Sequence, residues 1–332
     1  DHSPIFIDTE GHVQGDHQRT DQRCFESRWL QEENVMQIVS EAWDRTNPLA
    51  PIAERTASVH ATMHEWDRSI LKAPHRRLKE LKAELELLRS GPLTDEAGDR
   101  QRILLMEIEE NLEKEEIYWV QRSRANWLKF GDRNTSFFHN FASARKKRNY
   151  IIRLLDDSGV WRENNEAMRS LITEYFQHLF SAEVNVPAMN VITKVKRRVT
   201  DYMNESLMAP YTEEEVRKAL FCIGDLKAPG PDGLHAIFYK KFWHLLGGDL
   251  TKEVLAAVNT GTIPEGWNST TIVLIPKVDN PEKITQFRPI SLCNVVYKVI
   301  SKMLAARLKV FLPDIISETQ SAFVPGRIIT DN

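Results

Sequence analysis

The sequence predicts a mostly α-helical fold with small β-hairpins, in the α+β class. Long stretches after Pro51 repeat apolar residues at three- and four-residue spacings, the period of an amphipathic helix. Short β-branched and apolar runs flank turn-forming residues at 150–161 and 270–289, which is typical of hairpins. The chain has 332 residues, 42% hydrophobic and 27% charged, so it has room for about two domains.

Residues 1–23 carry short apolar pieces among Asp, His, Gln and Gly, without a helical period. This pattern predicts a strand followed by a loose connector, and not a whole domain.

Two helices are then predicted to form an antiparallel hairpin of coiled-coil type. The first ends at Ser90–Pro92 and the second begins near Thr94. Twelve acidic and six basic residues between Leu78 and Ile117 give a local net charge of −6. The apolar stripes are Leu78, Leu81, Leu85 and Leu88 on the first helix, and Leu105, Ile108, Leu112 and Trp119 on the second.

The segment 122–153 reverses this charge, with nine Lys or Arg residues against Asp132 alone, a net charge of +8. Basic groups interleaved with aromatic rings are what single-stranded nucleic acid binding uses. The alternative is a helix whose rings face the core and whose cations are solvated, and the rings alone favour it. The rings are Trp127, Phe130, Phe137, Phe138, His139, Phe141 and Tyr150.

A β-hairpin is predicted at 150–161 around a turn that ends in Gly159, followed by an amphipathic helix through Phe180. The weak pattern of 181–210 predicts a linker. Thr212 and Glu215 have the spacing of a capping box, which predicts a helix from there to about Ile223.

The loop 227–233 holds two prolines and two glycines in seven residues, so it is predicted to be rigid. Such a loop can bring backbone N–H groups and Lys227 close to a phosphate backbone. A sharp corner between helices explains the same pattern, and spacing does not decide between the two.

A second hairpin is predicted from the apolar run 270–275, ended by Pro276, and a returning arm at 287–289. It places Lys277 and Arg288 on opposing arms. Two cations on a stiff ribbon can neutralise a nucleoside triphosphate and orient it for in-line attack, although cations on a hairpin are more often solvated.

A long amphipathic helix is predicted from Ile290 to Leu312. One face would carry Leu292, Val296, Val299 and Met303, and another Lys298, Lys302 and Lys309. The helix would close a core while showing a basic edge, for which solvation is the simpler explanation.

The formal net charge of −3 means that a nucleic-acid footprint must be local. Cys24, Cys222 and Cys293 lie far apart without a C-x-x-C pair, which argues against a disulfide framework and a zinc site. The longest aliphatic run, 272–275, is far short of a membrane span. We therefore expect an intracellular protein, nuclear or cytoplasmic, that is neither secreted nor inserted in a membrane.

Four segments occur in a fixed order: APGPDG at 228–233, IVLIPK at 272–277, FRPISLCNVVYKVISKMLAARLK at 287–309 and QSAFVPGR at 320–327. This succession resembles the fingers region of plant non-LTR, LINE-type retrotransposon reverse transcriptases. The upstream segment WLKFGDRNTSFFHNFASARKKRNYI at 127–151 is similar to the linker that such polyproteins carry between endonuclease and polymerase. The resemblance covers essentially the whole chain.

The resemblance implies roles for particular residues. It places Lys277 and Arg288 by the incoming triphosphate, and it places the PGPDG loop and the basic linker on the template path. It also implies an RNA template and a DNA target as partners, and Mg²⁺ as the cofactor of the parent enzyme. The nucleic-acid-binding candidates are Lys227, Arg145, Lys146, Lys147, Arg148, Lys298, Lys302 and Arg327.

The resemblance also implies that the chemistry lies elsewhere. Asp1 and His2 resemble the end of the last catalytic box of an endonuclease/exonuclease/phosphatase-type nuclease, as a remnant without a pocket. The palm aspartates that hold two Mg²⁺ ions would follow Asn332. We therefore assign no intact catalytic group and no metal ligand, and expect this chain to bind nucleic acid without extending a primer. A non-catalytic helical scaffold, or a pseudogene product, is the alternative.

The expected organisation has five parts. They are an endonuclease remnant at 1–23, a helical linker with the hairpin at 24–121, a basic and aromatic segment at 122–180, a linker at 181–210, and a truncated fingers subdomain without its palm at 211–332.

Overall fold

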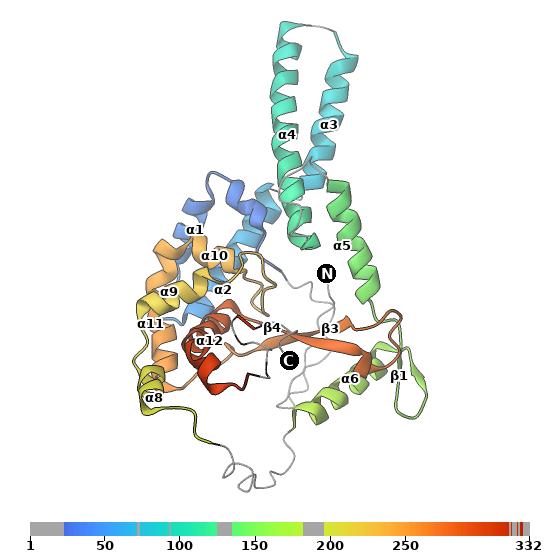
Figure 1. The fold of residues 1–332 in the computed structure, drawn as a ribbon. Helices are drawn as coiled ribbons and strands as arrows, with labels where there is room; N and C mark the ends of the chain where they lie inside the picture. Colours follow the sequence, from blue (N-terminus) through green and yellow to red (C-terminus); the bar gives the residue numbers. More distant parts are fainter. Residues whose placement is uncertain are drawn as a thin grey trace.

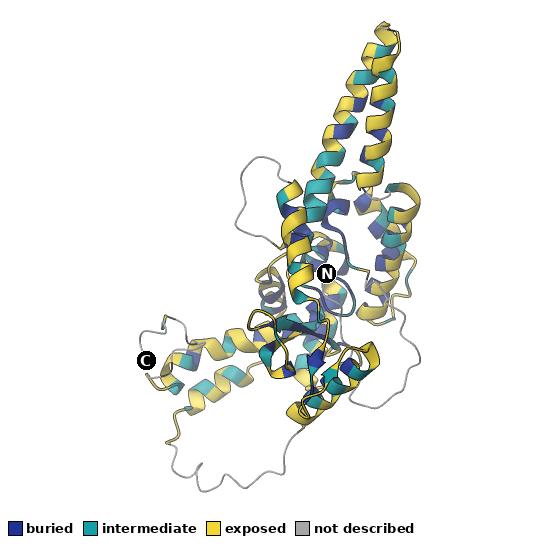
Figure 2. Ribbon diagram, turned by 90° about the vertical axis from the view of Figure 1, so that its right-hand side faces the viewer, coloured by how far each residue is buried: buried dark blue, intermediate teal, exposed yellow. Residues whose placement is uncertain are grey.

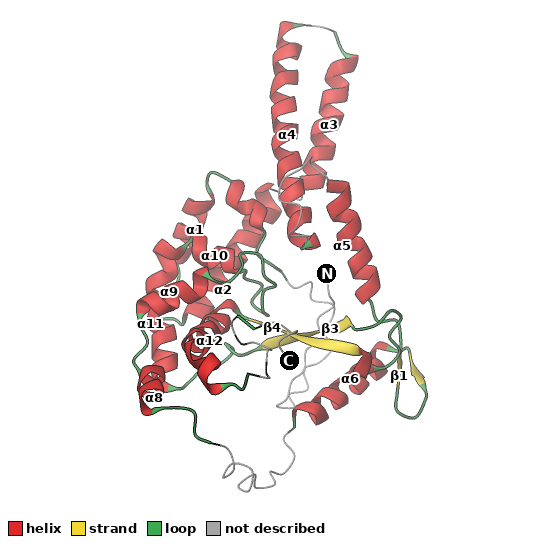
Figure 3. Cartoon of the chain, in the orientation of Figure 1, coloured by secondary structure: helices red, strands yellow, loops and turns green. Residues whose placement is uncertain are grey.

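The computed structural model describes residues 23–71, 74–92, 94–124, 135–181 and 196–318, together with 320, 324, 326 and 327. It shows a helical body from which one long hairpin of helices projects (Figure 1). Two small antiparallel sheets of two strands each complete the described part (Figure 3). The predicted fold class is therefore confirmed. The expectations for Asp1, His2, Trp127 and Phe130 lie outside the described residues.

The elements follow one another in a simple order. The first half contains η1 (Ser27–Gln31), α1 (Val35–Asp44), α2 (Ile52–Trp66), η2 (Asp67–Leu71), α3 (Pro74–Ser90), α4 (Asp95–Ser123) and α5 (Thr135–Asn149). Next come β1 (Leu154–Leu155), β2 (Trp161–Arg162), α6 (Asn165–Phe180), α8 (Asp201–Met208), α9 (Glu213–Phe221), α10 (Ala236–Lys241) and α11 (Trp243–Thr260). The last are β3 (Thr270–Pro276), η3 (Ile284–Gln286), β4 (Phe287–Cys293) and α12 (Val295–Ile315).

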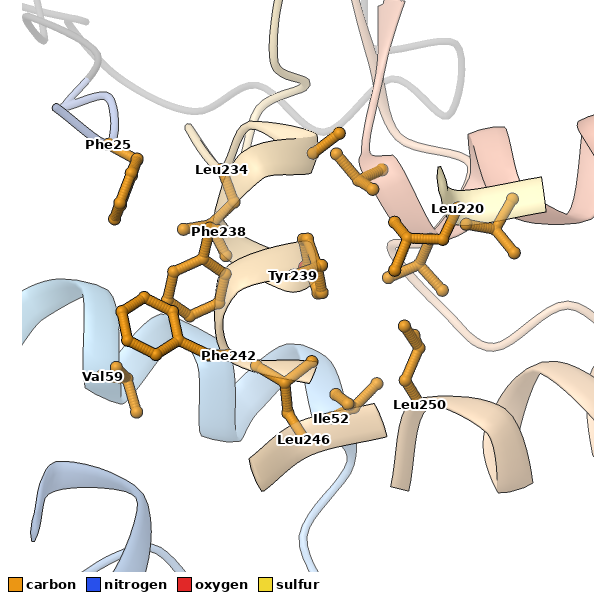
Figure 4. Close-up of a cluster of buried hydrophobic side chains, with 14 of the residues drawn as sticks. Phe25, Ile52, Val59, Leu220, Leu234, Phe238, Tyr239, Phe242, Leu246 and Leu250 are labelled. Atoms are coloured by element: carbon orange, nitrogen blue, oxygen red, sulfur yellow. The ribbon is translucent and has the colours of Figure 1, made fainter. Parts of the chain in front are cut away.

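The main core joins the beginning of the described chain to its second half. Phe25 and Trp29, from the segment before α1, are fully buried against residues of α2 and of α9 to α12. Figure 4 shows Phe25 at one side of this cluster, Phe238 and Tyr239 toward its middle, and Leu250 on the other side. The segments 25–66 and 216–303 thus share one apolar interior, whose burial is the main driving force for folding.

The hairpin of α3 and α4 has its own small core, made by Leu78, Leu81, Leu85, Leu104 and Ile108. The hairpin itself was predicted correctly. The assignment of Leu105 to its inner stripe was wrong, because Leu105 is 43% exposed while Leu104 is fully buried. Ion pairs Arg77–Glu107 and Arg100–Glu84 link the two helices. Most of the hairpin surface is exposed (Figure 2).

The β3–β4 hairpin pairs Thr270 with Cys293 at one end and Pro276 with Phe287 at the other. Its strands are longer than predicted. The expected helix start at Ile290 was wrong, because residues up to Cys293 continue the ladder and α12 begins only at Val295. Leu292 accordingly belongs to a sheet face and not to a helix face.

The two faces of this hairpin have different environments, since side chains alternate along a strand. Ile272, Leu274 and Phe287 face a second apolar core that includes Ile172 and Phe176 of α6. The opposite face carries Val273 and Ile275 of β3, together with the β4 residues paired with them. That face forms the site described below.

Several local predictions are confirmed. Thr212 and Glu215 form a complete capping box at the start of α9. The hairpin β1–β2 turns through Gly159, whose φ of 82° is readily adopted by glycine. The described residues of the predicted linker 181–210 include a short helix, α8, which begins with a side-chain cap at Thr200. No helix in the described ranges combines the length and apolar character needed to cross a membrane.

Candidate nucleic-acid interface

A cationic pocket of about 470 Å³ lies between the open face of the β3–β4 hairpin and the ends of α4 and α5. Figure 1 shows α5 running from the base of the helical hairpin toward the β3–β4 hairpin. Its polar lining residues are Arg124, Arg145, Arg148, Asn149 and Arg288. The remaining lining residues are Val273, Ile275, Pro276, Ile290 and Leu292.

The four arginines reach the pocket from three different parts of the fold. Arg145 and Arg148 lie one turn apart on α5, and Arg288 lies on β4 opposite Ile275. The Arg145 guanidinium donates from Nη1 to the Ser123 carbonyl at 3.0 Å, which ties α5 to the end of α4. Arg148 makes a longer, exposed contact of 3.3 Å with Asp279, which is weak in water.

Arg124 is the C-terminal cap of α4 and has left-handed backbone angles, φ 53° and ψ 26°. Partial withdrawal from water lowers the pKa of Arg124, and the positive charge of Arg145 lowers it further. Burial also lowers the pKa of Arg145. Both groups remain charged at neutral pH, because an arginine pKa starts so high. The fold therefore holds the positive charges of Arg124 and Arg145 close together. An anion in the pocket would reduce the repulsion between them.

Lys277 lies just beyond the end of β3, on the same side of the hairpin as Arg288. Ile275 pairs with Arg288, and Lys277 follows Ile275 by two residues, so alternation places the two cations on one face. The Lys277 ammonium donates to the Thr285 carbonyl at 2.7 Å. It does not line the pocket that Arg288 lines.

The loop 227–233 packs tightly against the start of α12. A Cβ on Gly230 would lie 2.2 Å from Asn294 Oδ1 and 2.3 Å from its backbone nitrogen, so only glycine fits there. The Lys298 ammonium donates to the Ala228 carbonyl at 2.6 Å, and burial lowers its pKa. Lys227 is exposed, while its carbonyl lies 2.9 Å from His235 Nδ1. The loop is thus a packed corner that leaves the Lys227 side chain outside.

The other predicted cations are spread over the surface. Lys146, Lys147 and Lys302 are exposed. Arg327 uses its guanidinium to cap the end of α12, donating to the Pro313 and Ile316 carbonyls at 3.2 and 3.3 Å and to residues just beyond. The structure therefore brings together Arg145, Arg148 and Arg288 but not the remaining candidates.

Arg124 is the pocket arginine that the sequence analysis did not single out. It was one of nine cations in its segment, and no pattern distinguishes it from Arg122. Only the fold separates the two, because Arg122 makes a two-pronged ion pair with Glu26 at 2.6 and 2.9 Å, whereas Arg124 lines the pocket.

The aromatic residues of α5 divide between both interpretations of the sequence. Phe138 is buried, in agreement with a core-facing stripe, whereas Phe141 is 39% exposed. His139 makes an edge contact with Trp119 of α4, with ring centroids 4.4 Å apart.

No three His, Cys, Asp or Glu side chains within the described ranges come together in a way that could hold a metal ion. Cys24, Cys222 and Cys293, which all lie among the described residues, form no disulfide.

Comparison with known proteins relates the chain to a mobile genetic element. It is 32% identical over 212 residues to the transposon TX1 uncharacterized 149 kDa protein of Xenopus laevis. The match covers 64% of this chain and 16% of that relative, so the chain spans a small part of the relative's length. No protein-family model matches.

Proposed function

We propose that this chain, a relative of a transposon protein, is a nucleic-acid-binding part of a retrotransposon RNA-directed DNA polymerase. The basic end of α5 contacts the RNA template. Lys277 and Arg288 on the β3–β4 hairpin contact the triphosphate of the incoming nucleotide.

The proposal rests on one observation: Arg145 and Arg148 of α5 and Arg288 of β4 line the same pocket over one face of the β3–β4 hairpin. The formal net charge of the chain is −3, so the molecule as a whole does not attract a polyanion. A polyanion would therefore have to bind at a local cationic surface. The relative supports a transposon origin, and the polymerase context comes from the resemblance of the four ordered sequence segments. Mg²⁺ belongs to the parent polymerase in this proposal, with ligands outside the described residues.

The test is the salt dependence of binding to a labelled single-stranded RNA, followed by fluorescence anisotropy. Charge reversal at Lys146, Lys147 and Arg148, each to Glu, should weaken binding and flatten the dependence of log K on log salt. The slope should fall by about 0.7 for every phosphate that the variant no longer neutralises.

A triple reversal at Lys79, Lys82 and Arg89, each to Glu, is the matched control. These cations are exposed on the projecting α3, and the change in net charge is the same. If both triple variants flatten the slope equally, the end of α5 is an ordinary solvated face and the proposal fails.

A scaffold role is the second candidate, supported by the projecting hairpin. Leu87 and Met106 are 72% and 65% exposed on it, which leaves apolar surface for another protein. Under this alternative, Leu87→Glu and Met106→Glu together would abolish self-association in sedimentation at micromolar concentration. If the parent chain is monomeric at that concentration, self-association cannot be the basis of a scaffold role.

A further inference from the structure

The arginine pocket has an apolar floor as well as a charged rim. Val273 and Ile275 of β3 and Ile290 and Leu292 of β4 share the face that the arginines overhang. Ile290 is 44% exposed, although Val273, its partner on β3, is buried. An inorganic anion would use the rim alone, whereas a ligand with a flat apolar part would use both surfaces.

The rim has no counter-charge among the described residues that line it. Four arginines and no Asp or Glu belong to this lining, and Asp279, the carboxylate paired with Arg148, lies at the exposed hairpin turn. Planar guanidinium groups match phosphate oxygens in a two-pronged geometry. The size of the pocket is within the range of small-molecule sites.

The backbone of Arg124 adds an independent observation. A left-handed conformation is unfavourable for a residue with a Cβ, and glycine usually occupies such helix ends. The α4 cap is nevertheless an arginine, and it lines the pocket. Strained positions of this kind concentrate at binding sites.

We propose that this pocket binds one nucleotide unit of a single-stranded nucleic acid. The strand phosphates lie on Arg124, Arg145 and Arg148, and the base lies against the exposed side chain of Ile290. The inference rests on the proposed nucleic-acid binding and deepens it by naming the pocket, the floor and Arg124. The strand phosphates are separate from the incoming triphosphate, which contacts Lys277 and Arg288.

Two variants of the full chain test the two halves of the pocket. Arg124→Gly removes the guanidinium and also the strained backbone, so thermal stability is kept or raised while binding falls about tenfold. Ile290→Thr keeps a β-branched side chain but removes apolar contact. It should weaken binding about fourfold with an unchanged salt slope.

Each variant has a matched control. Lys82→Gln removes one exposed cation of α3 that does not line the pocket, and Ile263→Thr changes an isoleucine of similar exposure, 41%, elsewhere. Both controls should bind within about twofold of the parent, as surface positions usually do. The proposed pocket is contradicted if Arg124→Gly weakens binding no more than Lys82→Gln does. The contact between the base and Ile290 is contradicted if Ile290→Thr and Ile263→Thr weaken binding equally.

Competition separates a strand from free phosphate. An unlabelled single-stranded oligonucleotide should displace the labelled one, and inorganic triphosphate at equal phosphate concentration should do so far less well, because it has no base. Equal competition would reduce the pocket to a phosphate site and overturn the base contact.

The two proposals also fail in different ways. If the parent chain binds RNA with a steep salt dependence but the pocket variants match their controls, only the pocket is wrong. If the parent chain shows no salt-dependent binding, the proposed function fails and the pocket falls with it.

Discussion

Asp232 and a group of buried histidines meet where the loop 227–233 packs on α2. Burial lowers the pKa of His60 to about 4, with the neighbouring His64 lowering it further, and burial lowers the pKa of His235 to about 4 as well. Burial raises the pKa of Asp232 to about 6. These shifts have opposite consequences for folding in acid.

The histidines destabilise the folded state as the pH falls. Their folded pKa values lie below the ordinary value of 6.5, so the unfolded chain takes up protons first, and stability is lost between about pH 6.5 and 4. The raised pKa of Asp232 acts in the opposite direction, because the folded chain takes up that proton first between about pH 6 and 3.8. Asp232 therefore offsets part of the loss.

We predict that Asp232→Asn steepens the acid loss of stability. Asparagine keeps an acceptor for the Leu234 N–H group, which donates to Asp232 Oδ1 at 3.0 Å, but takes up no proton. The variant should be more stable at pH 7, by no more than about 3 kcal/mol, and should lose more free energy of unfolding than the parent between pH 6 and 4. Urea unfolding at both pH values measures this, and parallel pH profiles would contradict it.

At the scale of one element, the α3–α4 hairpin shows how a helical period can be right while its phase is not. The leucines of α3 occupy the inner stripe as predicted. On α4, however, Leu104 and Leu105 are adjacent, and both fit an apolar stripe within one residue. The crossing of α4 against α3 decides which of them faces inward.

We predict that Leu104→Ala destabilises the hairpin by about 2–5 kcal/mol, because it leaves a cavity among Leu81 and its neighbours. Leu105→Ala should change stability by no more than about 0.5 kcal/mol. Hydrogen exchange of the α3 and α4 amides separates the two variants. Equal loss of protection in both would show that the inner stripe has been assigned to the wrong residue.

At the scale of the whole molecule, Gln121 joins the hairpin to the body. Its Oε1 accepts from the Ser27 backbone and hydroxyl at 2.8 Å, and its Nε2 donates to the Phe25 carbonyl at 2.7 Å. The same Nε2 lies 3.2 Å from His235 Nε2. One buried amide thus connects α4, the segment before α1 and His235, which follows the loop 227–233. Arg124, which lines the pocket, follows Gln121 by three residues.

We predict that Gln121→Ala lowers the free energy of unfolding by about 2–4 kcal/mol, because it leaves buried polar groups without partners. Hydrogen exchange should accelerate together in 24–31 and 227–235, while the distal hairpin around Leu81 keeps its protection. Asn111→Ala is the control, since the Asn111 amide donates to the Glu107 carbonyl one turn earlier on α4. Faster exchange confined to one of the two segments would argue against this connection.

Local patterns were enough to predict the helical hairpin, the capping box at Thr212 and the β3–β4 ribbon, because each depends on periodicity or turn residues within a short stretch. Local patterns did not predict which face of α4 is buried, the late start of α12 at Val295 or the short α8. These features depend on packing partners or on strand register. The convergence of Arg124, Arg145, Arg148 and Arg288 was decided by tertiary structure alone. These residues come from three elements, and only the packing of α5 against α4 and the open sheet face brings their charges together.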